Sequence, residues 1–117
     1  MTPKTDLKDV SIPNELAKSL GLDRDKEISL IRVCKNNDIS FLGLFGSYSR
    51  GEQNEKSDID FLANFSKRKS LLDHVRIERE MSNILGVKVD LVTEKSISHY
   101  LVDKIKKEVK PLYHDRS

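Results

Sequence analysis

The sequence predicts an α/β fold in which a small mixed β-sheet has helices packed on one face. Three short segments rich in β-branched and aromatic residues are typical of strands, near 39–45, 58–63 and 87–92. Segments with apolar residues at helical spacing precede, separate and follow them. The 117 residues, 37% of them hydrophobic, suffice for one packed core and not for two ordinary domains. We therefore expect a single domain over residues 1–117.

The first part of the chain predicts two helices and a strand. Residues 11–21 combine a capping serine, an early proline and a closing glycine, which together favour a short helix. A second helix is expected to begin at Asp23 or Asp25 and to end at the Asn-Asn-Asp run at 36–38. The apolar run 39–45 then predicts a buried strand that leads into a tight turn.

The second part predicts two further strands and two helices. After the strand at 58–63, a long helix is expected to end at Gly86 and to be followed by the strand at 87–92. A last helix over about 98–109 is expected to end before Pro111. The apolar side of the long helix is expected to comprise Leu71, Leu72, Val75, Met81, Ile84 and Leu85, and that of the last helix Leu101, Val102 and Ile105.

Composition excludes some classes of function. Lys and Arg (21) nearly balance Asp and Glu (19), and the net charge of +2 gives little reason to expect direct nucleic-acid binding. Cys34 is the only cysteine, so an intramolecular disulfide is impossible and a core position is expected. No apolar run approaches the roughly 20 residues of a membrane-spanning helix, and the first residues lack the apolar run of a signal peptide. A cytoplasmic location is the expectation.

Gly46 and Ser47 directly follow the first predicted strand. Backbone N–H groups at such a turn, together with the serine hydroxyl, are able to bind a phosphate, and glycine allows a close approach. A Gly-Ser pair by itself is more often an ordinary turn.

Three acidic residues stand within the other two predicted strands. Asp58 and Asp60 share one strand face, where their like charges repel unless a cation such as Mg²⁺ lies between them. By itself, such a pair is more simply an acidic strand edge that discourages aggregation. Asp90 is a lone acid in the third strand, for which pairing with Lys88 or another surface cation is the structural alternative.

Taken together, these pieces form a recognisable signature. The run Gly46-Ser47-Tyr48-Ser49-Arg50-Gly51, the six residues 52–57, and Asp58-Ile59-Asp60, with Asp90 on a later strand, resemble the DNA polymerase β-like nucleotidyltransferase superfamily. The size resembles its minimal nucleotidyltransferase (MNT) branch, which implies that superfamily's minimal fold. The motif-bearing core covers about 28–113, and residues 1–27 form a helical extension without a family motif.

The resemblance implies a site for ATP and two Mg²⁺ ions. The implied catalytic and metal-binding residues are Asp58, Asp60 and Asp90, and the nucleotide-binding candidates are Gly46, Ser47, Arg50 and Ser57. Arg50 either steadies a phosphate or braces the loop, and for Ser57 a role in the turn that orients Asp58 is favoured over ligand binding. Tyr48 departs from the smaller or basic residue of many relatives, and its ring either stacks near the nucleotide or covers the loop.

MNT proteins are commonly encoded beside HEPN-domain proteins. The resemblance therefore implies a nucleotidyltransferase antitoxin that transfers AMP from ATP to a tyrosine hydroxyl of a HEPN toxin, which would be both acceptor and partner. Two alternatives are an antitoxin that acts only by binding its toxin and a nucleotidyltransferase that modifies a small molecule. The chain has no room for the additional substrate domain of larger relatives, which disfavours the small-molecule alternative.

Overall fold

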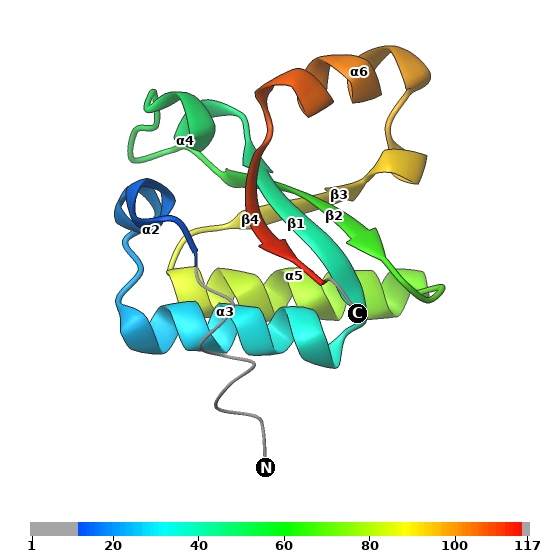
Figure 1. The fold of residues 1–117 in the computed structure, drawn as a ribbon, viewed down its shortest axis with the longest axis horizontal. Coiled ribbons are helices and arrows are strands. Elements are labelled where there is room, and N and C mark those ends of the chain that lie inside the picture. Colours follow the sequence, from blue (N-terminus) through cyan, green and yellow to red (C-terminus); the bar gives the residue numbers. More distant parts are fainter. Residues whose placement is uncertain (1–11, 116–117) are drawn as a thin grey trace.

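The computed structural model describes residues 12–115, and its centre is a four-stranded sheet in the order β3-β2-β1-β4 (Figure 1). The strands are β1 (Ile39–Phe45), β2 (Ile59–Phe65), β3 (Val89–Thr93) and β4 (Lys110–His114). β1 pairs antiparallel with β2 and β4, while β2 and β3 are parallel, so the sheet is mixed as predicted. The three predicted strands are all present, and β4 was not expected.

The helices begin and end close to the predicted signals. They are α2 (Asn14–Leu20), α3 (Arg24–Asn36), α4 (Ser47–Arg50), α5 (Leu71–Leu85), the 3-10 turn η1 (Glu94–Ser96) and α6 (His99–Glu108). The Asp23 side chain caps α3 by accepting from the backbone N–H of Lys26. Gly21 and Gly86 end α2 and α5 in the left-handed conformation. The serine expected to cap the first helix, Ser11, lies outside the described residues.

The helix layer under the sheet consists of α3 and α5, which lie side by side across one face (Figure 1). Ile31 and Cys34 of α3 and Ile77 and Met81 of α5 are at most 1% exposed and form the core with the inward side chains of the strands. The expected core position of Cys34 is thus confirmed. No helix within residues 12–115 is both long and apolar enough to cross a membrane.

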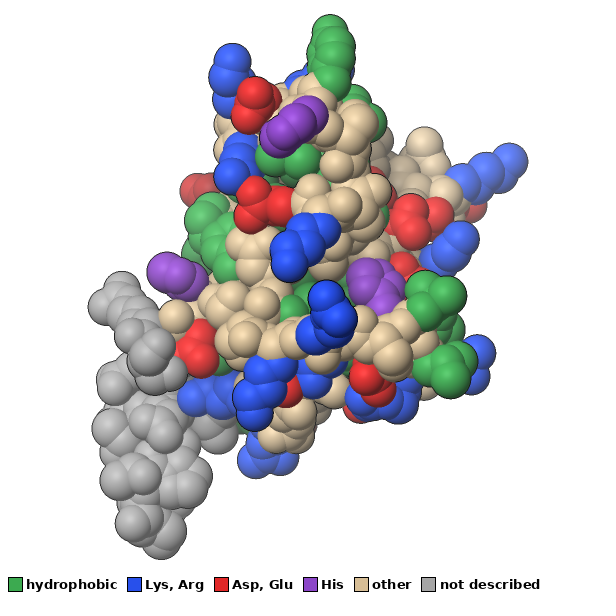
Figure 2. Space-filling view, turned by 90° about the vertical axis from the view of Figure 1, so that its right-hand side faces the viewer, with side chains coloured by type: hydrophobic (Ala, Val, Ile, Leu, Met, Phe, Trp, Pro, Cys, Tyr) green, Lys and Arg blue, Asp and Glu red, His purple; other side chains and the backbone are tan. Residues whose placement is uncertain are grey.

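The expected apolar side of α5 was wrong in its first turn. Leu71 and Leu72 are 79% and 81% exposed, and Val75 is also exposed. The buried stripe instead runs through Ile77, Met81 and Leu85, which recur every four residues and face the sheet. The first turn of α5 therefore presents hydrophobic side chains to solvent, on the side of the molecule that Figure 2 shows.

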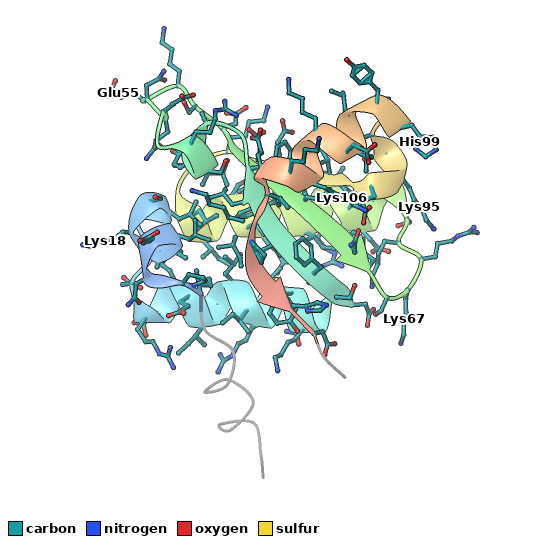
Figure 3. All side chains as sticks on the ribbon, turned by 45° about the horizontal axis from the view of Figure 1, so that its top comes forward. Lys18, Glu55, Lys67, Lys95, His99 and Lys106 are labelled. Carbon is teal, nitrogen blue, oxygen red and sulfur yellow. The ribbon has the colours of Figure 1, made fainter. Side chains whose placement is uncertain are left out.

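The last helix is present as predicted, but it packs less than expected. No residue of α6 is fully buried, and Leu101 is 46% exposed. Its Lys106, labelled in Figure 3, forms an ion pair with Glu94 at 2.6 Å. α6 lies on the far side of the sheet from α3 and α5 (Figure 1). It is therefore tied to the domain mainly by its ends and by polar contacts.

The chain does not stop at Pro111, but continues from α6 into β4. Pro111 is compatible with this strand because β4 is at the sheet edge, where a missing N–H is tolerated. Leu112 and Tyr113 are both buried, and Tyr113 lies opposite Leu42 of β1. Pro111 was interpreted only as the end of a helix, and this interpretation missed the short strand β4 that contains it.

Candidate active site

Three segments that are distant in the sequence meet at one end of the sheet. Phe45 at the end of β1 is paired with Asp60 of β2, and Gly46 follows Phe45 directly. Asp60 is in turn paired with Asp90 across the parallel β2–β3 ladder. Residues opposite one another on neighbouring strands, about 4.8 Å apart, project to the same side of the sheet. The structure therefore brings together the Gly46 turn and the acids of both strands.

The pKa of Asp60 reflects the charges of this cluster. Its side chain is partly buried, and its pKa is raised first by burial and then by the negative charges of Asp90 and Asp58. Arg50 opposes this effect and lowers the pKa. Carboxylates that disfavour one another's charge in this way would be relieved by a nearby cation.

The acids of this cluster supply only part of a metal site. Within residues 12–115, no group of three or more His, Cys, Asp or Glu side chains is arranged to hold a metal ion on its own. Mg²⁺ commonly uses only one or two carboxylates and completes its coordination with water and substrate phosphate oxygens. Asp60 with Asp58 or Asp90 would supply such a partial set, to be completed by the bound nucleotide.

Asp58 and Asp90 differ in their surroundings. Asp58 directly precedes β2, and its Oδ2 lies 3.9 Å from Lys88 Nζ, at a site where both side chains are substantially exposed. The cation proposed as the structural partner of Asp90 thus pairs with Asp58. Among residues 12–115, Asp90 forms no ion pair, and it is exposed on its strand. Its carboxylate is therefore accessible from solvent.

The Gly46 turn has a backbone that only glycine adopts readily. Its φ is 78° and its ψ is −158°, and a Cβ atom there would lie 2.2 Å from Asp60 Oδ2. Ser47 begins α4, and the buried Ser49 closes the turn by donating from its hydroxyl to the carbonyl of Gly46. The predicted phosphate turn is thus held in place, and glycine also makes room for the carboxylate beside it.

Arg50 braces this turn in the structure. Its Nε donates to Glu52 at 2.9 Å and its Nη1 donates to Glu108 at 2.9 Å. The same Oε1 of Glu108 also accepts a hydrogen bond from the backbone N–H of Gly46, at 2.8 Å. Two roles were left open for Arg50, binding a phosphate and bracing the loop. The contacts seen in the structure are of the bracing kind.

Glu108 was missed by the sequence analysis. It ends a lysine-rich helix, where an acid looks like one more exposed charge, and no motif marks it. Its contacts with Gly46 and Arg50 join residues 62 and 58 positions apart. Only the course of α6 into β4, which was not predicted, places it there.

The remaining two candidates have local roles. The Ser57 hydroxyl accepts from the backbone N–H of Asn54 at 2.9 Å and so closes the turn that precedes Asp58. Tyr48 is partly buried and packs against the hydrophobic core. The contact of Ser57 lies in the turn before Asp58, and that of Tyr48 is with the core rather than with the loop.

The mixed sheet, the two-helix layer and the acids grouped beside a Gly-Ser turn define a domain of the nucleotidyltransferase class. The chain belongs to the nucleotidyltransferase domain family, whose model matches residues 27–112, and it is therefore a nucleotidyltransferase. Its resemblance to the minimal branch of that class is confirmed by its relatives.

A relative from Methanocaldococcus jannaschii is 43% identical over 79 residues, which are 68% of this chain and 85% of the relative. The protein adenylyltransferase MntA of Thermococcus cleftensis is 40% identical over 68 residues, which are 58% of this chain and 69% of MntA. A crystal structure of a toxin–antitoxin with AMP-PNP contains a chain that is 27% identical, with a TM-score of 0.67. That match covers 81% of this chain and 76% of the other.

Proposed function

We propose that this protein is a Mg²⁺-dependent adenylyltransferase that transfers AMP from ATP to a tyrosine hydroxyl of a partner HEPN-domain toxin, for which it acts as antitoxin. The observation that carries the proposal is the pairing of Asp60 with Asp90 beside the Gly46 turn. The similarity to a named protein adenylyltransferase and to a toxin–antitoxin structure with AMP-PNP supports it. The HEPN acceptor follows from the resemblance to the MNT branch.

The three acids, the Gly46 turn and Ser57 have separate roles in this proposal. Asp58, Asp60 and Asp90 would hold Mg²⁺, which when bound neutralises phosphate charge and favours ionisation of the acceptor hydroxyl. The N–H groups at Gly46 and Ser47 would donate hydrogen bonds to the triphosphate, oriented by the fixed backbone of the turn. For Ser57, the hydrogen bond that its hydroxyl accepts from the backbone N–H of Asn54 supports a role in shaping the turn before Asp58 rather than in touching the nucleotide.

The transfer requires one bond to form and one to break. The acceptor oxygen forms a bond to the α-phosphorus, and the bond from that phosphorus to the bridging oxygen of the departing pyrophosphate breaks in line. The proton of the acceptor hydroxyl passes to the carboxylate of Asp90. Asp90 suits this role because it is exposed and is not engaged in an ion pair within residues 12–115, so a hydroxyl presented by another protein can reach it.

Mass spectrometry tests this function directly. The purified protein is incubated with ATP, Mg²⁺ and the HEPN-domain protein encoded beside it, and the intact mass of that partner is measured. We expect mass gains in units of AMP with wild type, and none with Asp58→Asn/Asp60→Asn. Asp103→Asn, which removes an exposed acid from α6, is the control and is expected to transfer normally.

The same experiment separates the alternatives. A tight complex with the toxin but no mass gain from wild type would contradict the proposal and favour an antitoxin that acts by binding alone. Neither complex nor mass gain, with transfer of AMP to a small acceptor instead, would favour the small-molecule activity.

A further inference from the structure

A single carboxylate oxygen joins the last helix to the candidate phosphate turn. Glu108 Oε1 accepts from the Gly46 N–H at 2.8 Å and from Arg50 Nη1 at 2.9 Å. The two donors come from opposite ends of the short segment 46–50 and converge on one atom. An anion of the protein itself thus lies where the proposed function requires an anion of the substrate.

These donors suit a phosphate oxygen as well as they suit a carboxylate. A backbone N–H and a guanidinium N–H form their strongest hydrogen bonds with charged oxygen acceptors, and phosphate offers several such oxygens. The Glu108 oxygen uses the Gly46 N–H and one N–H of Arg50 Nη1, so a phosphate that took these same two hydrogen bonds would have to replace it. Binding at this point is therefore an exchange of one anion for another.

The position of Glu108 is suited to such an exchange. Its side chain is 28% exposed, so the carboxylate can turn to water without breaking the core. α6, which carries it, has no fully buried residue and so loses little packing if its end shifts. Glu108 also adds negative charge near Asp60, which Asp58 and Asp90 already surround with like charge.

We propose that Glu108 is a positioning residue that holds the Gly46 turn and Arg50 in place without nucleotide and is replaced there by a phosphate of the incoming triphosphate. It follows that Glu108 competes with the nucleotide and sets its affinity. This inference rests on the proposed function, because it assumes that the turn binds a nucleotide. It adds a residue that belongs to no part of the recognised motif.

Calorimetric titration tests the competition. AMP-PNP with Mg²⁺ is titrated into wild type, Glu108→Gln and Glu108→Ala, with Asp103→Asn as a control that removes an exposed acid from the same helix. Without the charged competitor, we expect both Glu108 variants to bind about three- to tenfold more tightly. Asp103→Asn is expected to bind as wild type does. In the transfer assay, the Glu108 variants should show a lower KM for ATP with little change in kcat.

The opposite result has a distinct meaning. If the carboxylate only supports the turn, Glu108→Ala will bind AMP-PNP more weakly than wild type, and Glu108→Gln, which can still accept from Gly46, will fall between them. That order, or equal affinities, would overturn the inference and leave the proposed function intact. If AMP-PNP binds to none of the proteins while their melting curves show that they are folded, the proposed function fails together with the inference.

Discussion

The carboxylate of Asp60 lies against the α-carbon of Gly46, in the space that any side chain at residue 46 would fill. A Cβ atom built there would be 2.2 Å from Asp60 Oδ2, far inside van der Waals contact. The register of β1 and β2 causes this proximity, because Phe45, the residue before Gly46, is paired with Asp60. The turn and the acid therefore depend on each other for their positions.

Gly46→Ala is accordingly expected to abolish most of the transfer activity. The new methyl group would push Asp60 aside, and the backbone would be strained because φ at this residue is 78°. We expect a loss of about 1–3 kcal/mol in the free energy of unfolding. Urea denaturation and the AMP-transfer assay measure the two effects.

Gly51→Ala is the matched control for this change. Gly51 ends the same loop with a φ of 70°, but nothing lies within 4 Å of a Cβ atom placed there. The Gly51→Ala variant should lose about 1 kcal/mol in the free energy of unfolding, from backbone strain alone, and should keep its activity. Equal activity loss in both variants would show that backbone strain, and not the contact with Asp60, explains the effect.

The layered fold was largely predictable because its signals are local. Helix ends were marked by capping side chains and by glycine, and strands by dense apolar runs. The strand β4 was not predictable in this way, because Pro111 is a stop signal for a helix and its acceptability in a strand depends on an edge position. Edge positions are set by the whole sheet and are not visible in a local pattern.

The candidate site was predictable only as far as its motif extends. The motif named the residues that the structure brings to one end of the sheet, including Asp90 from a later strand. It did not name Glu108, whose contacts with Gly46 and Arg50 depend on how α6 returns to the sheet. Sequence spacing does not encode such a tertiary contact.

Removal of Mg²⁺ is expected to affect stability through the clustered carboxylates. Asp58, Asp60 and Asp90 repel one another, as the raised pKa of Asp60 reflects, after the larger effect of its burial. The melting temperature of wild type should therefore be higher in millimolar Mg²⁺ than in a chelator. In chelator, Asp60→Asn should melt at a higher temperature than wild type, and Mg²⁺ should change it less.

Differential scanning fluorimetry with and without Mg²⁺ provides this comparison. Asp103→Asn serves as the control, because it removes a negative charge that is exposed on α6. A melting temperature of Asp60→Asn below that of wild type in chelator would show that the repulsion is outweighed by contacts of the carboxylate.

The first turn and the middle of α5 should respond differently to truncation. Ile77 is fully buried, so Ile77→Ala is expected to lower the free energy of unfolding by about 2–5 kcal/mol. Leu71 and Leu72 are mostly exposed, so Leu71→Ser/Leu72→Ser should change it by roughly 0.5 kcal/mol or less per residue. Chemical denaturation of both variants tests this difference, and a large loss from the serine variant would contradict the exposed position of the first turn.

Cys34 should be unreactive toward thiol reagents in the folded protein. It should also make the free energy of unfolding depend on pH in the alkaline range. Its side chain is fully buried, and burial raises the pKa of the thiol from 9.0 to about 12. A thiol reagent added at pH 8 should therefore react only as fast as the protein unfolds. Rapid reaction in native buffer, with no acceleration by urea, would show that the thiol is accessible.

The sign of the pH effect follows from the direction of the shift. The folded pKa lies above the unfolded value, so the folded protein keeps a proton that the unfolded chain releases once the pH exceeds about 9. The free energy of unfolding should then fall as the pH rises from 9 toward 12, by at most about 1.4 kcal/mol per pH unit from this one group. Cys34→Ala removes the titrating group but leaves the buried Tyr113, whose pKa is also raised to about 12, so wild type and variant should differ in slope by the thiol's contribution. Urea denaturation of both proteins between pH 8 and 11 measures that difference, and parallel slopes would mean that the thiol ionises equally readily in the folded and unfolded states.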